Sequence, residues 1–211
     1  MSGENWRGFL AAPKAKVLGS KVIYSGPVFG VRQDRVVEPG GVASVRDVVT
    51  HNGSVVLLPV FPDGRLLLVR QYRHAVGGYL WELVAGRIEP GESPLQAARR
   101  ELLEETGYTA RRFGKLLDVF PTPGFVSEHM VVYAVEELKP GEARPEADER
   151  IRTRRFSLRE LEAMMRRGRL RDAKSIASIL YYRRFCRRKR SPPSGRAGSR
   201  VSGLLPRTGV D

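Results

Sequence analysis

Three glutamates in one short stretch of the chain could hold a metal ion together. Glu101, Glu104 and Glu105 occupy positions i, i+3 and i+4, so a helix would place them on one face. Like charges at this spacing repel each other, and Arg100, four residues before Glu104, offsets only part of the repulsion. Carboxylates are the ligands that a hard cation such as Mg²⁺ prefers. The alternative interpretation is a solvated acidic helix face, which is common.

The residues around the glutamates predict that helix. Ser93 is a suitable N-cap, Pro94 suits the first helical position, Gln96 completes a capping box and Gly107 suits the C-terminal stop. The preceding segment, residues 86–92, is bracketed by glycines and would let backbone oxygens approach the same ion.

The remaining apolar runs predict an α/β or α+β domain, because strand patterns are interspersed with helical ones. Residues 54–61 and 66–69, joined by a Pro-Asp-Gly turn, predict a hairpin in the core. The other expected elements are short strands over 16–50 with a turn at 39–41, strands over 116–120 and 130–136, and helices over 158–167 and 173–185.

Composition excludes several classes of protein. The chain has 211 residues, a hydrophobic fraction of 41% and a single cysteine. That hydrophobic fraction suffices for a core, whereas one cysteine can form neither an internal disulfide nor a Cys-rich zinc module. The first residues show no signal-peptide pattern, and the apolar stretches are too short to span a bilayer. We therefore expect a cytoplasmic protein that does not enter a membrane.

The net charge of +14 is concentrated at the C-terminus. Residues 183–211 carry nine Lys or Arg and one Asp, which gives this segment +8 of the total. From residue 191 onward the sequence is rich in Ser, Pro, Gly and Arg without apolar periodicity, so we expect a disordered tail. Such a tail favours at most nonspecific contact with nucleic acid.

The glutamates belong to a longer pattern with fixed spacing. Gly86, Glu92 and the run from Arg100 to Tyr108 resemble the Nudix hydrolase box, G-x5-E-x7-R-E-U-x-E-E-x-G-U, at all seven fixed residues and both apolar positions. A chance match in a chain of this composition is on the order of 10⁻⁵, so the motif is specific. The resemblance extends over roughly residues 17–185. It implies a Nudix-type α/β/α sandwich with a mixed sheet, plus an N-terminal antiparallel β region.

Features outside the box resemble the ADP-ribose pyrophosphatase branch of this family. They are the segments 69–73 (VRQYR), 81–86 (WELVAG) and 121–125 (PTPGF), the last with Thr122 where that branch has Ser. The implied reaction is hydrolysis of ADP-ribose to AMP and ribose 5-phosphate. Two alternatives remain open: a Nudix pyrophosphatase for another nucleoside diphosphate sugar such as GDP-mannose, and a nucleotide-sensing protein that binds nucleic acid.

The resemblance also assigns the metal site. Glu101, Glu105 and the backbone carbonyl of Ala85 are the expected Mg²⁺ ligands, with Mn²⁺ as a possible substitute. Glu104 is either a further ligand or the partner that orients Arg100. Glu92 is expected to orient Arg100 or the loop.

Substrate contacts and the general base lie outside the box. Arg73 is the candidate for the pyrophosphate, because a guanidinium presents two donors to phosphate oxygens. Phe29 and Arg46 are candidates for the adenine, although a phenylalanine at such a position is more often a core residue. Pro123 and Gly124 would form a loop beside the ribose or phosphate.

The general base is expected on a loop at 139–150. Glu149 is the first candidate and Glu146 the second, by the resemblance of the following Ile-Arg pair to the start of the family's next strand. The resemblance further implies a homodimer formed through residues 1–50, a hydrolase domain over 51–185 and a basic tail over 186–211.

Overall fold

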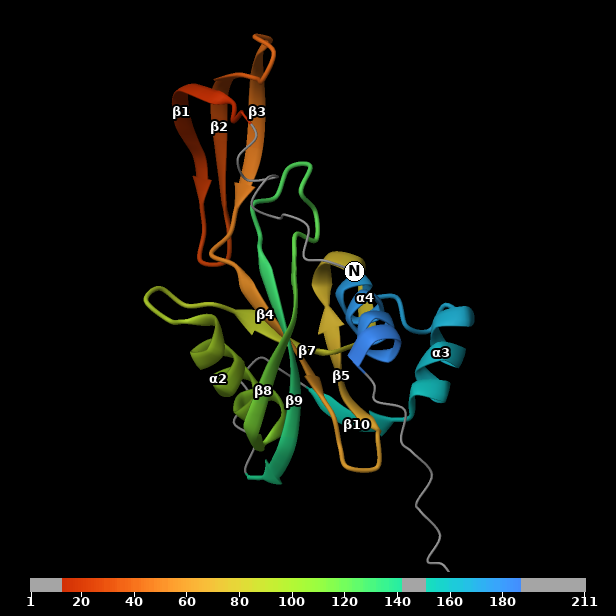
Figure 1. Ribbon diagram of the computed structural model, residues 1–211. Coiled ribbons are helices and arrows are strands. Elements are labelled where there is room, and N and C mark those ends of the chain that lie inside the picture. Colours follow the sequence, from red (N-terminus) through yellow and green to blue (C-terminus); the bar gives the residue numbers. More distant parts are fainter. Residues whose placement is uncertain (1–12, 142–150, 187–211) are drawn as a thin grey trace, which may run out of the picture.

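The computed structural model describes residues 13–141 and 151–186 of the chain. These residues form three sheets and three α-helices. One sheet extends away from a body in which helices cover two faces of the remaining strands (Figure 1).

The extended sheet is an antiparallel meander of β1 (Lys16–Ser25), β2 (Gly30–Val37) and β3 (Ala43–Thr50). The predicted turn at 39–41 joins β2 to β3, where the Glu38 N–H donates to the Val42 carbonyl at 2.8 Å. Gly40 and Gly41 both have positive φ values, of 102° and 86°, a conformation that glycine adopts at low cost.

The central sheet is mixed and has the strand order β7–β4–β9–β8. Strands β4 and β9 are parallel, whereas the other pairs are antiparallel. Every residue of β4 is buried, because alternate side chains of this strand enter two separate hydrophobic clusters. The four strands are β4 (Ser54–Pro59), β7 (Val84–Arg87), β8 (Tyr108–Val119) and β9 (Met130–Pro140).

A second sheet of the body has the order β10–β5–β6. Its strands are β5 (Leu66–Arg73), β6 (Gly78–Glu82) and β10 (Arg152–Phe156), with a 3₁₀ turn, η1 (His74–Val76), between β5 and β6.

The predicted core hairpin between 54–61 and 66–69 is wrong. The turn exists, but a single antiparallel bridge between Val60 and Leu66 is the only ladder pairing recorded between these segments. Both edges of β4 are taken by β7 and β9, so β5 pairs with β6 and β10 instead.

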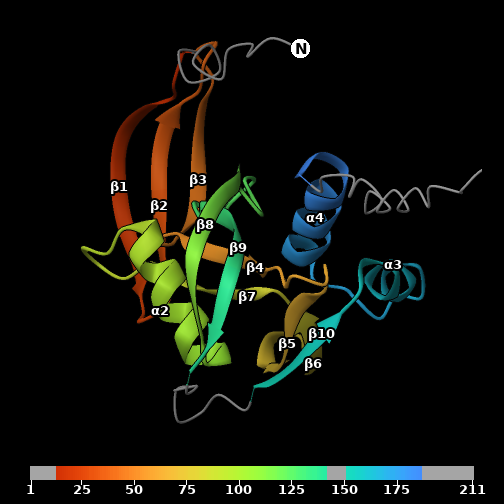
Figure 2. The same ribbon diagram turned by 60° about the horizontal axis from the view of Figure 1, so that its bottom comes forward.

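The helices lie on opposite sides of the strands. Helix α2 covers one face of the central sheet, and α3 and α4 lie on the other side of the body (Figure 2). These layers confirm the predicted α/β/α sandwich. The helices are α2 (Pro94–Thr106), α3 (Leu158–Arg166) and α4 (Ala173–Tyr181).

Several predicted boundaries differ from the structure. Strands β5 and β9 extend to Arg73 and Pro140, beyond the predicted residues 69 and 136. The third helix ends at Tyr181 and continues as a π-helical turn, η2 (Tyr182–Cys186). Strand β8 begins at Tyr108, directly after the glycine that ends α2, well before the predicted residue 116. Charged, exposed residues such as Arg111 and Arg112 hid this start from the apolar pattern. Within the described ranges, no helix is both long enough and apolar enough to cross a membrane.

Candidate functional site

Helix α2 holds the acidic residues at one edge of the central sheet. Its start is the predicted capping box: Ser93 Oγ accepts from the Gln96 N–H at 3.3 Å, and Gln96 Oε1 accepts from the Ser93 N–H at 2.8 Å. Its end is the predicted stop, because Gly107 adopts the left-handed conformation with φ 70°. The helix is therefore fixed at both ends by residues of the box or next to it.

Arg100 connects the acidic residues of the box. Its Nε and Nη2 donate to the two carboxylate oxygens of Glu92 at 3.1 and 3.0 Å. Its Nη1 donates to Glu101 Oε1 at 2.7 Å and to Glu104 Oε2 at 3.0 Å. Its Nη2 also donates to the Arg87 carbonyl at 2.9 Å, which ties α2 to β7. The hydrogen bonds from Arg100 hold the pKa of Glu92 below its usual value and raise the pKa of Arg100 itself.

Gly86 in β7 makes room for the carboxylate of Glu101. A Cβ atom at this position would lie 1.9 Å from the Glu101 Cδ, much closer than any real contact. A side chain at the first glycine of the box would therefore displace the Glu101 carboxylate from its place beside strand β7.

A cavity of about 320 Å³ lies between α2, β7, the end of β5 and the turn between β1 and β2. Glu105 is buried in its wall, with 5% of its surface exposed. Predicted site residues that line the cavity are Arg73, Ala85, Glu101, Glu104 and Glu105, together with Gly86 and Arg100 of the box.

The turn between β1 and β2 contributes to this cavity. Val28 lines it, and Arg87 Nη1 donates to the Pro27 carbonyl at 2.6 Å. Neither contact was predicted, because nothing in the local sequence of an exposed turn indicates its distant partner.

Arg73 enters the cavity from β5 and is held by a buried carboxylate. Its Nε and Nη2 donate to the two oxygens of Glu82 at 2.8 and 2.9 Å, and Glu82 is only 1% exposed. Burial alone would raise the pKa of Glu82, but the hydrogen bond from Arg73 and the charge of Lys174 outweigh burial and lower it. The hydrogen bond to Glu82 raises the pKa of Arg73. The pair holds the cationic guanidinium of Arg73 in place at the cavity wall.

The atoms around the cavity are of the kind that a hard divalent cation requires as ligands, since four carboxylates, those of Glu89, Glu101, Glu104 and Glu105, line one space together with Ala85. In the part of the chain that the structure describes, no three acidic, His or Cys side chains converge as a set of metal ligands. Glu101 and Glu104 each direct an oxygen to Arg100 instead. A carboxylate has two oxygens, so this hydrogen bond does not prevent it from ligating a cation.

Four predicted substrate contacts lie away from the lining of this cavity. Arg46 is an exposed residue of β3 whose Nε donates to Glu38 Oε1 at 2.9 Å. Pro123 and Gly124 are exposed in the loop between β8 and β9. Phe29 follows the cavity residue Val28, packs against Tyr24 and is 44% exposed, so it is not a core residue.

The loop of Pro123 and Gly124 is tied to the N-terminal sheet. The Val49 N–H donates to the Phe125 carbonyl at 2.8 Å, and the Ser127 N–H donates to the Val49 carbonyl at 2.9 Å. The two regions that were predicted to contact the nucleoside are therefore adjacent to each other. The candidate bases, Glu146 and Glu149, lie outside the described residues.

Comparison with known proteins gives the class of this protein. The model of the NUDIX domain matches residues 50–179, which is more than half of the chain. The protein belongs to the Nudix family, and the resemblance of its box is confirmed.

Three named relatives show which members of that family the chain resembles. The ADP-ribose pyrophosphatase of Bacillus subtilis (strain 168) is 34% identical over 168 residues, 79% of this chain and 91% of the relative. That of Mycobacterium tuberculosis is 39% identical over 133 residues, 63% of this chain and 64% of the relative. The GDP-mannose pyrophosphatase of Yersinia enterocolitica is 33% identical over 150 residues, 66% of this chain and 78% of the relative.

A solved structure of an ADP compounds hydrolase shares the fold. It superposes with a TM-score of 0.72 at 24% sequence identity, covering 81% of this chain and 93% of that one. Its likeness supports the architecture described above.

Proposed function

We propose that this protein hydrolyses the pyrophosphate bond of ADP-ribose and releases AMP and ribose 5-phosphate. The observation that carries the proposal is the cavity itself, in which the box glutamates and the cationic Arg73 face one space. A pyrophosphate bridge is anionic, so its hydrolysis needs neutralisation of charge and an oriented water. The names of the Bacillus and Mycobacterium relatives favour ADP-ribose over other nucleoside diphosphates.

Mg²⁺, or Mn²⁺ in its place, would be held by Glu101, Glu105 and the backbone carbonyl of Ala85. Glu104 would be either a further ligand or the partner that orients Arg100. The bound cation would neutralise phosphate charge and lower the pKa of a water ligand. Arg100 would keep Glu101 and Glu104 oriented towards the cavity, and Gly86 would keep the space for Glu101. Arg73 would bind a phosphate oxygen through its guanidinium.

The Glu105→Gln variant tests the metal site. We expect its Mg²⁺-dependent release of AMP from ADP-ribose to fall about 100-fold or more, because a buried anionic ligand becomes neutral. Glu162→Gln is the matched control, since Glu162 pairs with Arg183 in the helical layer. Normal turnover by Glu105→Gln would refute the metal assignment.

The base of the reaction is proposed to be Glu149, with Glu146 as the second candidate. Glu149→Gln should retain Mg²⁺ affinity, measured by isothermal titration, and lose most of its turnover, because a base deprotonates the attacking water without being needed for metal binding. If Glu146→Gln is the inactive variant and Glu149→Gln is active, the assignment passes to Glu146.

GDP-mannose is the second candidate substrate, because GDP-mannose pyrophosphatases also match the chain. The ratio of the two kcat/KM values decides between them, and a higher value for GDP-mannose would replace ADP-ribose in the proposal. A nucleotide-sensing nucleic-acid-binding protein would instead show tight, sequence-selective gel shifts at physiological salt that depend on residues 186–211.

We further propose that the enzyme acts as a homodimer in the cytoplasm. The dimer is supported by apolar side chains exposed on the N-terminal sheet, and the compartment by the use of a single cysteine. Phe29, Arg46, Pro123 and Gly124 would then contact the nucleoside in the assembled dimer.

A further inference from the structure

A row of alternating charges runs from the cavity to the start of helix α4. Arg73 is bound by Glu82 through two hydrogen bonds, Glu82 Oε2 accepts from Lys174 Nζ, and Lys174 Nζ lies 2.9 Å from Asp172 Oδ1. Arg73, at the cavity end, is the most exposed of the four side chains, and Glu82 in the middle is buried. Lys174 lies 92 positions after Glu82 in the sequence.

The far end of this row is fixed by backbone structure. Asp172 is the N-cap of α4, where its Oδ2 accepts from the Ser175 N–H at 3.1 Å. Ser175 Oγ in turn accepts from the N–H of Leu83, the residue after Glu82, at 2.7 Å. The start of α4 is therefore bonded directly to the end of β6, and Lys174 has little freedom to move relative to Glu82.

Lys174 also changes the charge balance around Arg73. A buried carboxylate paired with one guanidinium would neutralise it before any anion arrived. Glu82 Oε2 accepts hydrogen bonds from both Arg73 and Lys174, so two cations share the negative charge of the Glu82 carboxylate. Lys174 is itself paired with Asp172, so the row carries no net charge, and its cationic end, Arg73, faces the cavity while both oxygens of Glu82 hold the guanidinium in place.

We propose that Lys174 is a positioning residue for Arg73, which acts through Glu82 to orient the guanidinium and preserve its affinity for the pyrophosphate group of the substrate. The inference rests on the proposed function insofar as Arg73 is the pyrophosphate ligand. It adds a residue from the C-terminal helix, outside the box and outside the cavity lining.

Binding of inorganic pyrophosphate, measured by isothermal titration with Mg²⁺ present, tests the inference independently of ADP-ribose hydrolysis. We expect Lys174→Met and Lys174→Gln each to weaken this binding about tenfold, because each removes the cation that shares the Glu82 carboxylate with Arg73. Lys174→Gln keeps a donor for Glu82 and serves if Lys174→Met does not fold. Lys174→Arg should bind nearly as the wild type does, because it keeps the cation. Lys115→Met, which removes a surface lysine paired with Asp118, is the matched control.

A double-mutant cycle separates positioning from general destabilisation. If Lys174 acts through Arg73, Lys174→Met should cause no further loss of pyrophosphate binding in an Arg73→Met background. Additive losses would overturn the inference, as would a wild-type protein that binds no pyrophosphate.

The same variants are then assayed with ADP-ribose and Mg²⁺. If the losses of pyrophosphate binding in the variants are coupled but the wild-type protein does not hydrolyse ADP-ribose, the role of Lys174 is upheld and the proposed substrate is refuted. If the wild type hydrolyses ADP-ribose but the losses are additive, the substrate is upheld and the role of Lys174 is refuted.

Discussion

Arg100 determines how the acidic residues of α2 are arranged. It hydrogen bonds Glu92, Glu101 and Glu104 with one guanidinium and ties them to the backbone of Arg87. Five donors in a planar fork can satisfy this many oxygens, whereas the ammonium of a lysine has three donors and no fork. The repulsion expected among glutamates at helical spacing is therefore relieved by one residue of the same box.

The pKa of Glu92 leads to a prediction about stability and pH. Because Arg100 lowers the pKa of Glu92 in the folded protein, this glutamate contributes stability when the pH is above the unfolded-state value of about 4.3. That contribution is lost as the pH falls through the lower folded-state pKa. Glu92→Gln should thus be less stable than the wild type at neutral pH, and the difference should shrink in acid. Urea unfolding across this pH range measures it, and a difference independent of pH would contradict the explanation.

Helix α2 is positioned by its caps, and the structure offers a matched comparison. Ser93 starts α2 and Ser157 starts α3, each in a complete capping box. Of these two helices, only α2 contributes residues to the cavity of the candidate site. The two serines therefore have the same local role and different consequences for the site.

Replacing each cap by alanine separates stability from activity. We expect Ser93→Ala and Ser157→Ala each to lower the free energy of unfolding by about 1 kcal/mol, as measured by urea denaturation. Ser93→Ala should also lower kcat/KM for ADP-ribose, because the first turn of α2 follows the loop that carries Glu92. Equal activity of the two variants would show that the cap of α2 does not position the site.

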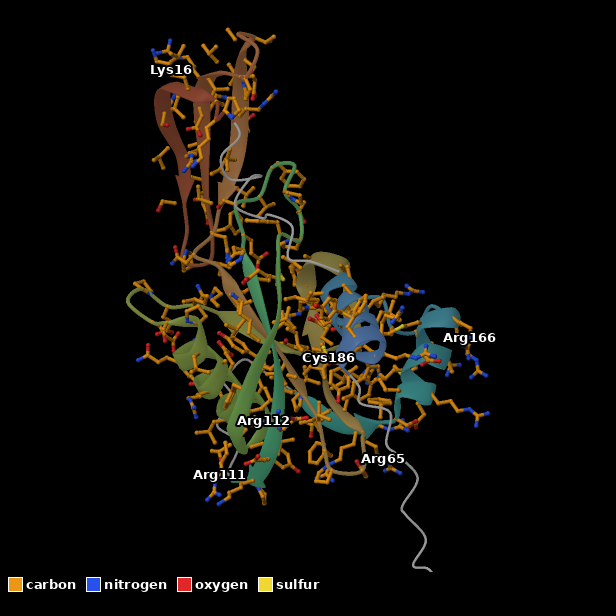
Figure 3. All side chains as sticks on the ribbon, viewed as in Figure 1. Lys16, Arg65, Arg111, Arg112, Arg166 and Cys186 are labelled. Atoms are coloured by element: carbon orange, nitrogen blue, oxygen red, sulfur yellow. The ribbon has the colours of Figure 1, made fainter. Side chains whose placement is uncertain are left out.

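Both charged and apolar side chains are exposed across the molecule. Arg65, Arg111 and Arg166 lie at the periphery of the body (Figure 3), and Arg112 is also exposed. The N-terminal sheet exposes several apolar residues on β1, namely Val17, Leu18, Val22, Ile23 and Tyr24, next to charged ones such as Lys21. Exposed apolar side chains in this number are typical of an interface, which favours the proposed dimer.

A charge on that sheet should dissociate the dimer. Val22 is 71% exposed, so Val22→Glu should leave the fold of one subunit unchanged while burying a charge in the proposed interface, which is costly. Light scattering coupled to size exclusion should give a dimer for the wild type and a monomer for the variant. Val76→Glu, an exposed apolar residue outside the sheet, is the control. A wild-type monomer would refute the dimer.

The sequence by itself determined the parts of the site that are local. The caps of α2, the side-by-side glutamates and the orienting role of Arg100 all depend on spacings within residues 86–108, and helical geometry converts such spacings directly into proximity. Arg73 and Ala85 were found from segments beside the box, and both line the cavity.

Only the tertiary structure decided which distant segments meet. Strands β4 and β5 separate into different sheets because β7 and β9 already occupy both edges of β4, and the short turn between them suggested the opposite. Lys174 meets Glu82, and Val28 meets the box, across long separations in sequence. No local pattern encodes these contacts, because they arise when separate hydrophobic faces pack around one core and bring their polar ends together.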